Sequence, residues 1–185
     1  MKIPVAALAD VRERLAEAGG RRLHASTFEE TWVLDDGRRT RVGSGRLLRV
    51  RRAGEDAWLT LKEPGSFAEG VKSRVEVETP VGSAERTLAV LAGLGFEPVR
   101  RYQKRRESWS LGGITVALDE TPMGAYVELE GPAERLPAAA LALGLDPRQA
   151  VTETYLGLWL AYRARHPEAP VDMVFADADP GGTAT

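Results

Sequence analysis

The sequence predicts an α+β protein built on a closed or nearly closed eight-stranded antiparallel β-barrel, a tunnel with helices packed outside it. Two observations lead to this fold class. Segments with the two-residue alternation of strands follow one another between turn residues, and amphipathic helical segments lie among them. On strand after strand, the charged side chains share one face and the apolar side chains share the other. Roughly seven or eight strands in a chain of this size must curl or split, and an eight-stranded barrel leaves room inside for one small ligand.

The first half of the chain predicts a helix followed by strands. Residues 4–18 form the helix, with Pro4 in its first turn, an apolar stripe along one face, and a stop at Gly19. Strands are expected near residues 23–34, 45–52, 57–62 and 71–79. Turn residues separate these segments, so the strands indicate an antiparallel meander.

The second half adds further helices and strands. Ser83 can cap a helix that runs to about residue 94. Strands are expected at residues 99–111, 114–119 and 126–130, the first two joined by a tight hairpin at two glycines. A shorter helix at residues 137–143 precedes a long one that opens at Asp146 and closes at His166.

Length and composition bound the class of protein. A chain of 185 residues suits one domain, predicted over residues 1–175, with residues 176–185 as a disordered tail. The net charge of -2 gives no general attraction to nucleic acid or to an anionic membrane, so neither is expected as a partner. The chain shows no signal-peptide pattern and no stretch near the roughly 20 apolar residues of a membrane helix, which leads us to expect a cytoplasmic location.

The residue types also restrict metal chemistry. The chain has no cysteine and two histidines, His24 and His166, which excludes thiolate sites and argues against a multi-histidine zinc site. A bound metal would therefore be a hard cation held by carboxylates, such as Mg²⁺ or Mn²⁺.

The charged faces of the strands could be enclosed or exposed. Arg49 and Arg51 oppose Leu48 and Val50, and the same split recurs along the later strands. The alternative fold is a flat sheet with helices on one side, in which the valines form the core and the charges are solvated. The barrel is favoured because the shared faces carry arginine and glutamate, with few of the uncharged polar residues that usually fill a solvated sheet face. The strand near residues 100–111 carries charges on both faces, so its period does not orient it.

A barrel that encloses these charges would suit a polyanion and a metal. Buried charges are costly without partners, and we do not expect these acids and bases simply to pair off. Converging guanidinium and ammonium groups suit a ligand with several phosphoryl oxygens. The candidate inward basic residues are Lys2, Arg49, Arg51, Lys62, Lys72, Arg74, Lys104 and Arg106. The candidate acids, which suit Mg²⁺ or Mn²⁺ bridged to phosphate, are Glu76, Glu78, Asp119, Glu128 and Glu130.

Several short runs resemble, in order and spacing, the CYTH superfamily, whose members are also called triphosphate tunnel metalloenzymes. The runs are L-R-V-R at 48–51, L-T-L-K at 59–62, R-V-E-V-E at 74–78, K-R-R at 104–106 and L-D-E-T-P-M-G-A-Y-V-E-L-E at 118–130. The likeness extends to about residue 165, and the last run is its most specific piece. It implies an eight-stranded antiparallel tunnel that binds a triphosphate and a divalent metal, as in inorganic triphosphatases, thiamine triphosphatase and class IV adenylyl cyclases.

The resemblance also implies roles for individual residues. Phosphate would be held by Arg49, Arg51, Lys62, Arg74, Lys104 and Arg106. Metal would be held, or the basic groups ordered, by Glu76, Glu78, Asp119, Glu128 and Glu130. Tyr155 matches a tyrosine often found on the family's late helix, and we interpret it first as a packing residue. The family signature E-x-E-x-K is matched only by Lys2, which means either that the start has been assigned too late or that this is a variant with weakened catalysis.

Together these inferences predict a metal-dependent triphosphatase that hydrolyses inorganic triphosphate or a small organic triphosphate. The catalytic candidates are Lys2, Lys62 and Arg106, with Lys2 or a glutamate freed from metal binding as the general base. The alternatives are a class IV adenylyl cyclase that makes cyclic AMP from ATP, and a non-catalytic polyphosphate- or nucleotide-binding module if the N-terminal glutamates are absent. The expected partner is a small-molecule triphosphate and the expected cofactor is Mg²⁺ or Mn²⁺. The oligomeric state stays open between monomer and homodimer.

Overall fold

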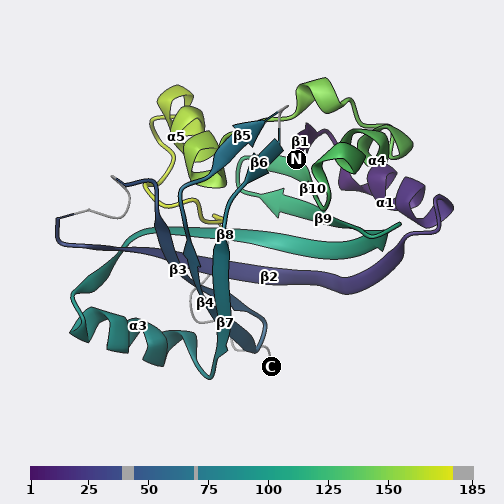
Figure 1. The fold of residues 1–185 in the computed structure, drawn as a ribbon. Coiled ribbons are helices and arrows are strands. Elements are labelled where there is room, and N and C mark those ends of the chain that lie inside the picture. Colours follow the sequence, from purple (N-terminus) through teal and green to yellow (C-terminus); the bar gives the residue numbers. More distant parts are fainter. Residues whose placement is uncertain (39–43, 69–70, 177–185) are drawn as a thin grey trace, which may run out of the picture.

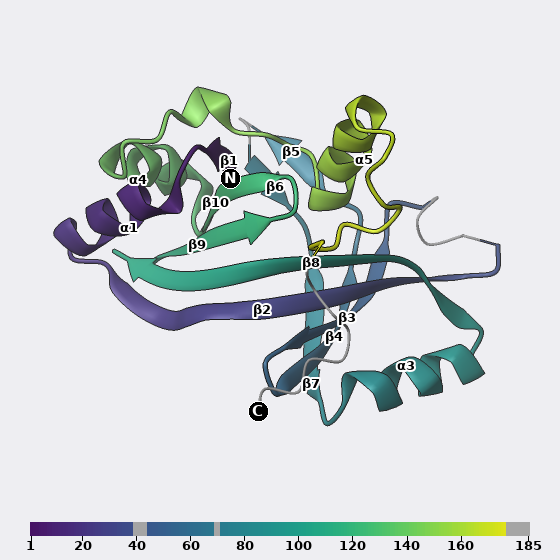
Figure 2. The same ribbon diagram turned by 180° about the vertical axis from the view of Figure 1, so that it is seen from behind.

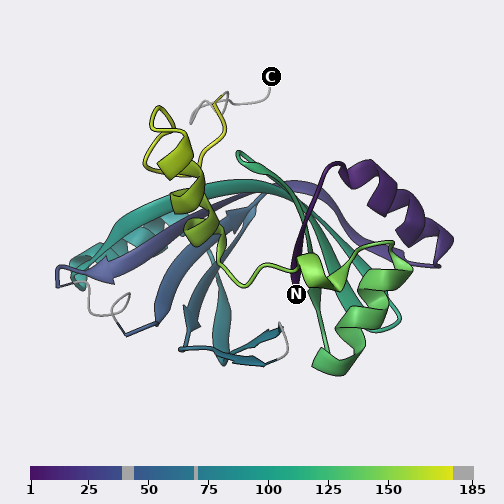
Figure 3. The same ribbon diagram turned by 90° about the horizontal axis from the view of Figure 1, so that it is seen from above.

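The predicted eight-stranded antiparallel sheet is present, and it is curved into an arch. The structure is a computed structural model that describes residues 1–38, 44–68 and 71–176. The strands are hydrogen-bonded in the order β1-β10-β9-β8-β2-β3-β4-β7. The sheet runs from one wall over a crown to the opposite wall (Figure 3). No ladder joins the edge strands β1 and β7 within the described ranges, so the barrel is open along one side.

The strands alternate as their sequences predict, and two long strands form the crown. The bounds are β1 Lys2–Val5, β2 Arg21–Asp36, β3 Leu47–Ala53, β4 Asp56–Lys62, β7 Glu76–Val81, β8 Phe96–Leu111, β9 Ile114–Thr121 and β10 Gly124–Glu130. A separate two-stranded sheet pairs β5 (Ser66–Ala68) with β6 (Val71–Ser73). β2 and β8 pair along nearly their whole length, and register shifts between them help the sheet to bend (Figures 1 and 2).

Helices cover the outer face of one wall. These are α1 (Leu8–Glu17) and α4 (Leu136–Ala142), which follows the short 3₁₀ turn η1 (Ala133–Arg135). Val11 and Leu15 of α1 join a buried cluster with the outward side chains Val116 and Val127 of β9 and β10. Apolar strand faces therefore point outward beneath helices, as the barrel hypothesis requires.

The opposite wall is covered only in part. Helix α3 (Ala84–Gly93), capped by Ser83 as predicted, packs Leu91 against the outward Leu48 and Val50 of β3. Beyond it, at the edge of the sheet, Val75 and Val77 are 67% and 63% exposed. The expectation that the apolar side chains turn out beneath helices is therefore wrong for these two valines, because α3 does not extend over the edge strand.

Helix α5 (Tyr155–Arg165) lies at one end of the arch (Figures 1 and 3). Its Tyr155 and Trp159 form a buried cluster with Val33, Tyr102 and Tyr126, which come from the crown and from β10. The cluster fills that end of the concave space with aromatic side chains.

Three predicted elements have different bounds. Pro4 lies in β1, paired with Tyr126, so the first helix begins at residue 8 instead of residue 4. The strand predicted at residues 71–79 is divided between β6 and β7. The long helix predicted from Asp146 begins only at Tyr155, after the 3₁₀ turn η2 (Pro147–Gln149), because the Val151 N–H donates to the Lys2 carbonyl of β1.

The remaining expectations concern the tail and membrane association. From residue 177 onward, the predicted tail lies outside the described residues. Among the helices that the structure describes, none has the length and apolarity needed to cross a bilayer.

Candidate functional site

The concave face of the arch gathers the polar side chains that alternate along its strands. Cross-strand partners share a face in an antiparallel sheet, so the register identifies this face. On one wall Arg49 pairs with Thr60, which pairs with Glu78. On the other side Arg106 pairs with Asp119. The charges of both walls therefore line one concave surface, and β8, which its period could not orient, turns the face of Arg106 inward.

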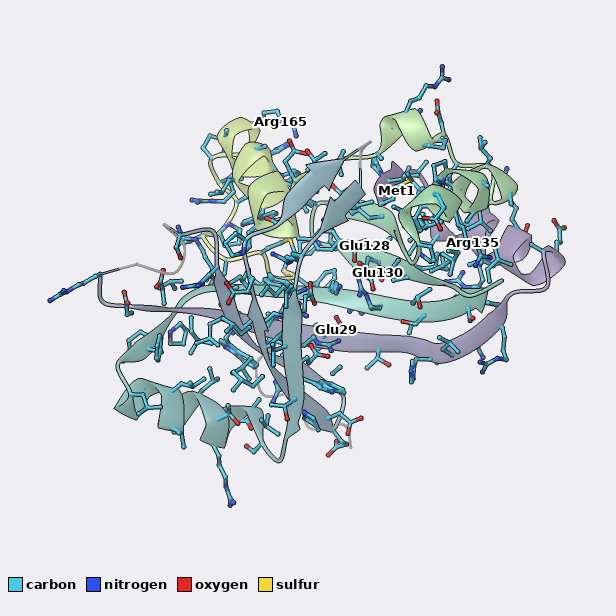
Figure 4. The ribbon with its side chains drawn as sticks, in the orientation of Figure 1. Met1, Glu29, Glu128, Glu130, Arg135 and Arg165 are labelled. Carbon is cyan, nitrogen blue, oxygen red and sulfur yellow. The ribbon has the colours of Figure 1, made fainter. Side chains whose placement is uncertain are left out.

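Carboxylates from β2 and β10 both lie on this concave surface (Figure 4). Figure 4 shows Glu29, on β2, beneath Glu128 and Glu130, on β10, with Met1 beside them. Glu29 is buried, whereas Glu130 is exposed. The glutamates therefore extend from the crown of the arch toward its open side.

Arg106 lies between two carboxylates. Its Nε donates to Asp119 Oδ1 at 2.7 Å, its Nη2 donates to Asp119 Oδ2 at 2.5 Å, and Nη2 also donates to Glu128. Burial by itself would lower the pKa of the guanidinium, but the two carboxylates raise that pKa well above its ordinary value. Arg106 therefore stays positively charged between the carboxylates of Asp119 and Glu128.

Asp119 is saturated with donors. It is 0% exposed, and besides Arg106 its Oδ2 has Lys104 Nζ at 3.3 Å and the Tyr155 hydroxyl at 2.5 Å. Burial would raise the pKa of Asp119, but Lys104 and Arg106 hold it well below its ordinary value. Lys104 also lies 3.5 Å from Glu29 Oε2. Asp119 therefore holds two cations side by side.

Lys2 joins β1 to the segment before α5. Its Nζ donates to the Glu153 carbonyl at 3.0 Å, lies 3.4 Å from Glu128 Oε1, and stands 3.8 Å from the centre of the Tyr155 ring. Burial lowers the pKa of Lys2, opposed by the charge of Glu128. The ammonium is thus enclosed by a carbonyl, a carboxylate and an aromatic face.

On the other wall, Glu78 is shared between two arginines. Arg51 Nη2 donates to its Oε1 at 3.3 Å, and Arg49 Nη2 lies 3.6 Å from its Oε2. Thr60 donates to the same Oε2 at 2.7 Å. Arg51 also donates to Glu29 at 3.1 Å, which links this wall to the crown of the arch.

The end of this wall holds a second group of charges. Lys62 Nζ lies 2.6 Å and Arg74 Nε 3.2 Å from Glu76 Oε1. Burial lowers the pKa of Lys62, and the nearby Arg49 lowers it further. Lys72 lies in β6, and its side chain falls outside what the structure describes.

These contacts show that the acids and bases of the concave face do pair with one another, contrary to the expectation that they would not. Some donors stay unused: within the described part of the chain, the buried Nε atoms of Arg49 and Arg51 have no hydrogen-bond partner. A buried guanidinium N–H without an acceptor is costly, and a shift of the side chain that brings this N–H to an anion in the arch would remove the cost.

The five acids predicted to bind metal do not gather into one group. Glu76 and Glu78 lie on the β7 wall and the others on β9 and β10, and no cluster of three acidic or histidine side chains suited to a metal occurs among the described residues. Asp119 has no free oxygen because Arg106, Lys104 and Tyr155 occupy both. Glu128 and Glu130 share the concave face of β10, and two carboxylates with phosphate oxygens suit Mg²⁺. A metal held there jointly with substrate would have to displace Lys2 and Arg106, which contact the two oxygens of Glu128.

Sequence reasoning missed several residues of the site. Glu29 is a central acceptor, but Glu30 follows it directly, so the period of the strand did not reveal which glutamate points inward. Glu30 points to the outer face, where it binds Arg52 and Gln103. Tyr155 was interpreted as a packing residue, and its hydroxyl contact with Asp119 carried no sequence signal.

The depressed carboxyl pKa values predict loss of stability in acid. Burial would raise the pKa of Glu29, Glu76, Glu128 and Asp119, but neighbouring cations lower it in each case. The unfolded chain has ordinary carboxyl pKa values near 4 and binds more protons than the folded chain below that pH. These groups therefore stabilise the fold fully above about pH 4 to 5 and less as the pH falls through the folded-state values. Urea unfolding at a series of pH values from 7 to 2 measures the loss.

Asp119→Asn provides the comparison. Each unit by which a pKa is lowered contributes about 1.4 kcal/mol, so the variant should show a shallower fall in the free energy of unfolding below about pH 4. Asp10→Asn, on the exposed side of α1, should follow the parent protein. An identical acid dependence for Asp119→Asn and the parent protein would contradict the assignment.

Comparisons with known proteins show the family and the fold. A family model described as the CYTH domain matches residues 1–146. The fold is similar to that of a proposed adenylate cyclase from Vibrio parahaemolyticus, with a TM-score of 0.74 and 18% identity over 84% of this chain and 92% of that one.

Two further solved structures are similar. A protein from Pyrococcus horikoshii has a TM-score of 0.66 and 24% identity, over 88% of this chain and 98% of that one. A proposed adenylyl cyclase from Hippeastrum, described as having a dominant triphosphatase activity, has a TM-score of 0.63 and 13% identity, over 88% of this chain and 94% of that one. A search of the curated proteins found no match.

Proposed function

This chain belongs to the CYTH domain family, and we propose that it is a metal-dependent triphosphatase that hydrolyses inorganic triphosphate or a small organic triphosphate in the arch. The observation that carries the proposal is the pair of cationic walls on one concave surface, with buried guanidinium N–H groups on Arg49 and Arg51 that lack an acceptor within the described residues. Guanidinium groups grip phosphate with two parallel hydrogen bonds, so these two arginines are suited to a ligand rich in phosphoryl oxygens.

Binding would exchange internal ion pairs for contacts with phosphate. Lys62 and Arg74 share Glu76, and Lys104 and Arg106 share Asp119, so each wall presents two cations held in place by one acid. Arranging the cations in advance reduces the reorganisation needed when charge develops on the phosphoryl oxygens. We assign Asp119 to this ordering role instead of to metal binding.

Glu128 and Glu130 would hold the metal together with phosphate oxygens. When bound, the metal would polarise the terminal phosphoryl group. The cations of the two walls neutralise charge on the triphosphate while water attacks the terminal phosphorus in line. The bond to the bridging oxygen breaks, and diphosphate and inorganic phosphate are released.

Lys2 is the candidate general base that the sequence suggested, and burial lowers its pKa in the direction that favours the neutral amine. Its donation to the Glu153 carbonyl, however, directs it toward the segment before α5. A Lys2→Ala variant with the turnover number of the parent protein would remove Lys2 from this role.

One assay tests the proposal. Release of phosphate and of pyrophosphate is measured from tripolyphosphate, thiamine triphosphate and ATP, with Mg²⁺, with Mn²⁺ and with chelator. We expect metal-dependent release of phosphate. Pyrophosphate together with cyclic AMP would favour the cyclase, and tight binding without release would favour a binding module.

Matched variants identify the site responsible. Lys62→Ala should lose activity because Lys62 lies in the arch beside Glu76. Arg46→Ala should retain it, because Arg46 is half-exposed and pairs with Glu63 at the surface. Equal activity of the two variants would place the reaction elsewhere.

A further inference from the structure

Tyr155 places a hydroxyl inside the ion-pair network of the arch. It is the first residue of α5, is 8% exposed, and donates to Asp119 Oδ2 at 2.5 Å. Burial raises the pKa of the Tyr155 hydroxyl well above its ordinary value, and the charges of Glu128 and Asp119 raise it further, so the group remains a neutral donor. Helix α5, which is far from β9 in sequence, thus supplies a hydrogen-bond donor to Asp119, the carboxylate that contacts Lys104 and Arg106.

The position of Tyr155 is fixed from several directions. The Val151 N–H donates to the Lys2 carbonyl at 2.8 Å, and Lys2 Nζ donates to the Glu153 carbonyl at 3.0 Å. Thr154 caps the helix by accepting from the Gly157 N–H. The segment that delivers the tyrosine is therefore tied to β1 before the helix begins.

The donors on Asp119 Oδ2 are not equivalent. Arg106 Nη2 and the Tyr155 hydroxyl each lie at 2.5 Å, whereas Lys104 Nζ lies at 3.3 Å. A carboxylate oxygen has two lone-pair sites, and here the two short contacts occupy them. Lys104 is left with a long contact to Asp119 and a 3.5 Å contact to Glu29. Lys104 Nζ thus still donates to Asp119 Oδ2, but at a longer distance than the guanidinium and the tyrosine hydroxyl.

We propose that Tyr155 is a positioning residue for triphosphate binding, whose hydroxyl occupies Asp119 Oδ2 and so leaves the Lys104 ammonium available to phosphate. The inference rests on the proposed function and adds to it a requirement for α5. Without the hydroxyl, Lys104 moves onto Asp119, and a phosphate must compete with a full ion pair for that cation. The tyrosine ring, with Lys104 Nζ 5.3 Å from its centre, remains as a wall in either case.

A purely structural role makes a different prediction. A buried hydroxyl needs a partner, and Asp119 would satisfy it whatever the site does. In that case Tyr155→Phe would change the melting temperature without a specific effect on phosphate binding. A role through Lys104 requires instead that the effect of Tyr155→Phe depends on Lys104 being present.

The experiment is a double-mutant cycle on the full chain, with binding of tripolyphosphate measured by calorimetry in chelator. The variants are Tyr155→Phe, Lys104→Gln and the double variant. Tyr162→Phe is the control, because Tyr162 is on the same helix and stacks on Trp159 away from Asp119. We expect Tyr155→Phe to raise the dissociation constant about 10-fold, the effect of one charged hydrogen bond. On the Lys104→Gln background the same change should have an effect of less than about 2-fold.

Steady-state kinetics and thermal unfolding accompany the cycle. The KM for the hydrolysed triphosphate should rise in Tyr155→Phe with little change in kcat, since the loss is one of binding. Unchanged binding in Tyr155→Phe, or an equal loss with and without Lys104, would overturn this inference alone. A parent protein that neither binds nor hydrolyses tripolyphosphate, thiamine triphosphate or ATP would overturn the proposed function and this inference together.

Discussion

Replacing Arg106 by glutamine is expected to lower the free energy of unfolding by about 3 kcal/mol, because Asp119 and Glu128 lose the guanidinium that they share and keep only the longer contacts with Lys104 and Lys2. The side chain of Asp119 is 0% exposed and that of Glu128 is 19% exposed, so water can solvate only the second of them. Their repulsion should also raise the pKa of one carboxyl group. Urea unfolding at pH 7 measures the change.

The same substitution should reduce kcat/KM for the hydrolysed triphosphate by about 100-fold or more, since one preorganised cation is removed from the developing charge. Arg106→Lys is the matched control. It keeps the charge but loses the two parallel hydrogen bonds to Asp119, so it should restore much of the stability and less of the activity. If the free energy of unfolding of Arg106→Gln lies within about 1 kcal/mol of that of the parent protein, Arg106 is not an essential partner of the two buried carboxylates.

Replacing Arg49 by glutamine should differ from Arg106→Gln. We expect a large loss of affinity for tripolyphosphate and a small change in the free energy of unfolding. Its contacts are loose: Nη1 donates to the Tyr102 hydroxyl at 3.3 Å, Nη2 lies 3.6 Å from Glu78, and Nε has no partner within the described residues. Glu78 keeps Arg51 and Thr60 when Arg49 is lost. The free energy of unfolding should therefore change by less than about 1 kcal/mol.

Affinity for tripolyphosphate should fall by about 10- to 100-fold in Arg49→Gln, which corresponds to about 1.5–3 kcal/mol for hydrogen bonds between a guanidinium and phosphate. Arg46→Gln, from the exposed pair with Glu63 just before β3, should leave both affinity and stability unchanged. Calorimetric titration of the parent protein, Arg49→Gln and Arg46→Gln with tripolyphosphate measures the three affinities. A large loss of stability with unchanged affinity in Arg49→Gln would mean that this arginine serves the fold and not the ligand.

The alternation of residue types was enough to predict much of the fold. Arg49 and Arg51, and Glu76 and Glu78, share faces because strand side chains repeat every two residues. The run at 118–130 and the other short motifs indicated the family, and the family model confirms it over residues 1–146. The predicted bounds of an element were wrong where it pairs with a segment far away in the sequence. Pro4, for example, was predicted to begin a helix but pairs with Tyr126 in the sheet.

The sequence named most of the charged side chains that the concave face gathers, but not their contacts. Glu29 was missed because the adjacent Glu30 made the alternation ambiguous. Asp119 was grouped with the metal ligands, whereas its neighbours in space saturate it with donors. Such contacts depend on how far the sheet bends and on where α5 docks, and neither leaves a periodic signal.

By itself, the sequence determined which side chains lie together on most strands and that the chain belongs with the CYTH proteins. Only the tertiary structure decided that the sheet stays open between β1 and β7, that Glu76 and Glu128 stand on different walls, and that Tyr155 reaches Asp119. The reason is physical. The pleat of a strand is a local property of the backbone, whereas curvature and ion pairing depend on packing between segments far apart in the chain.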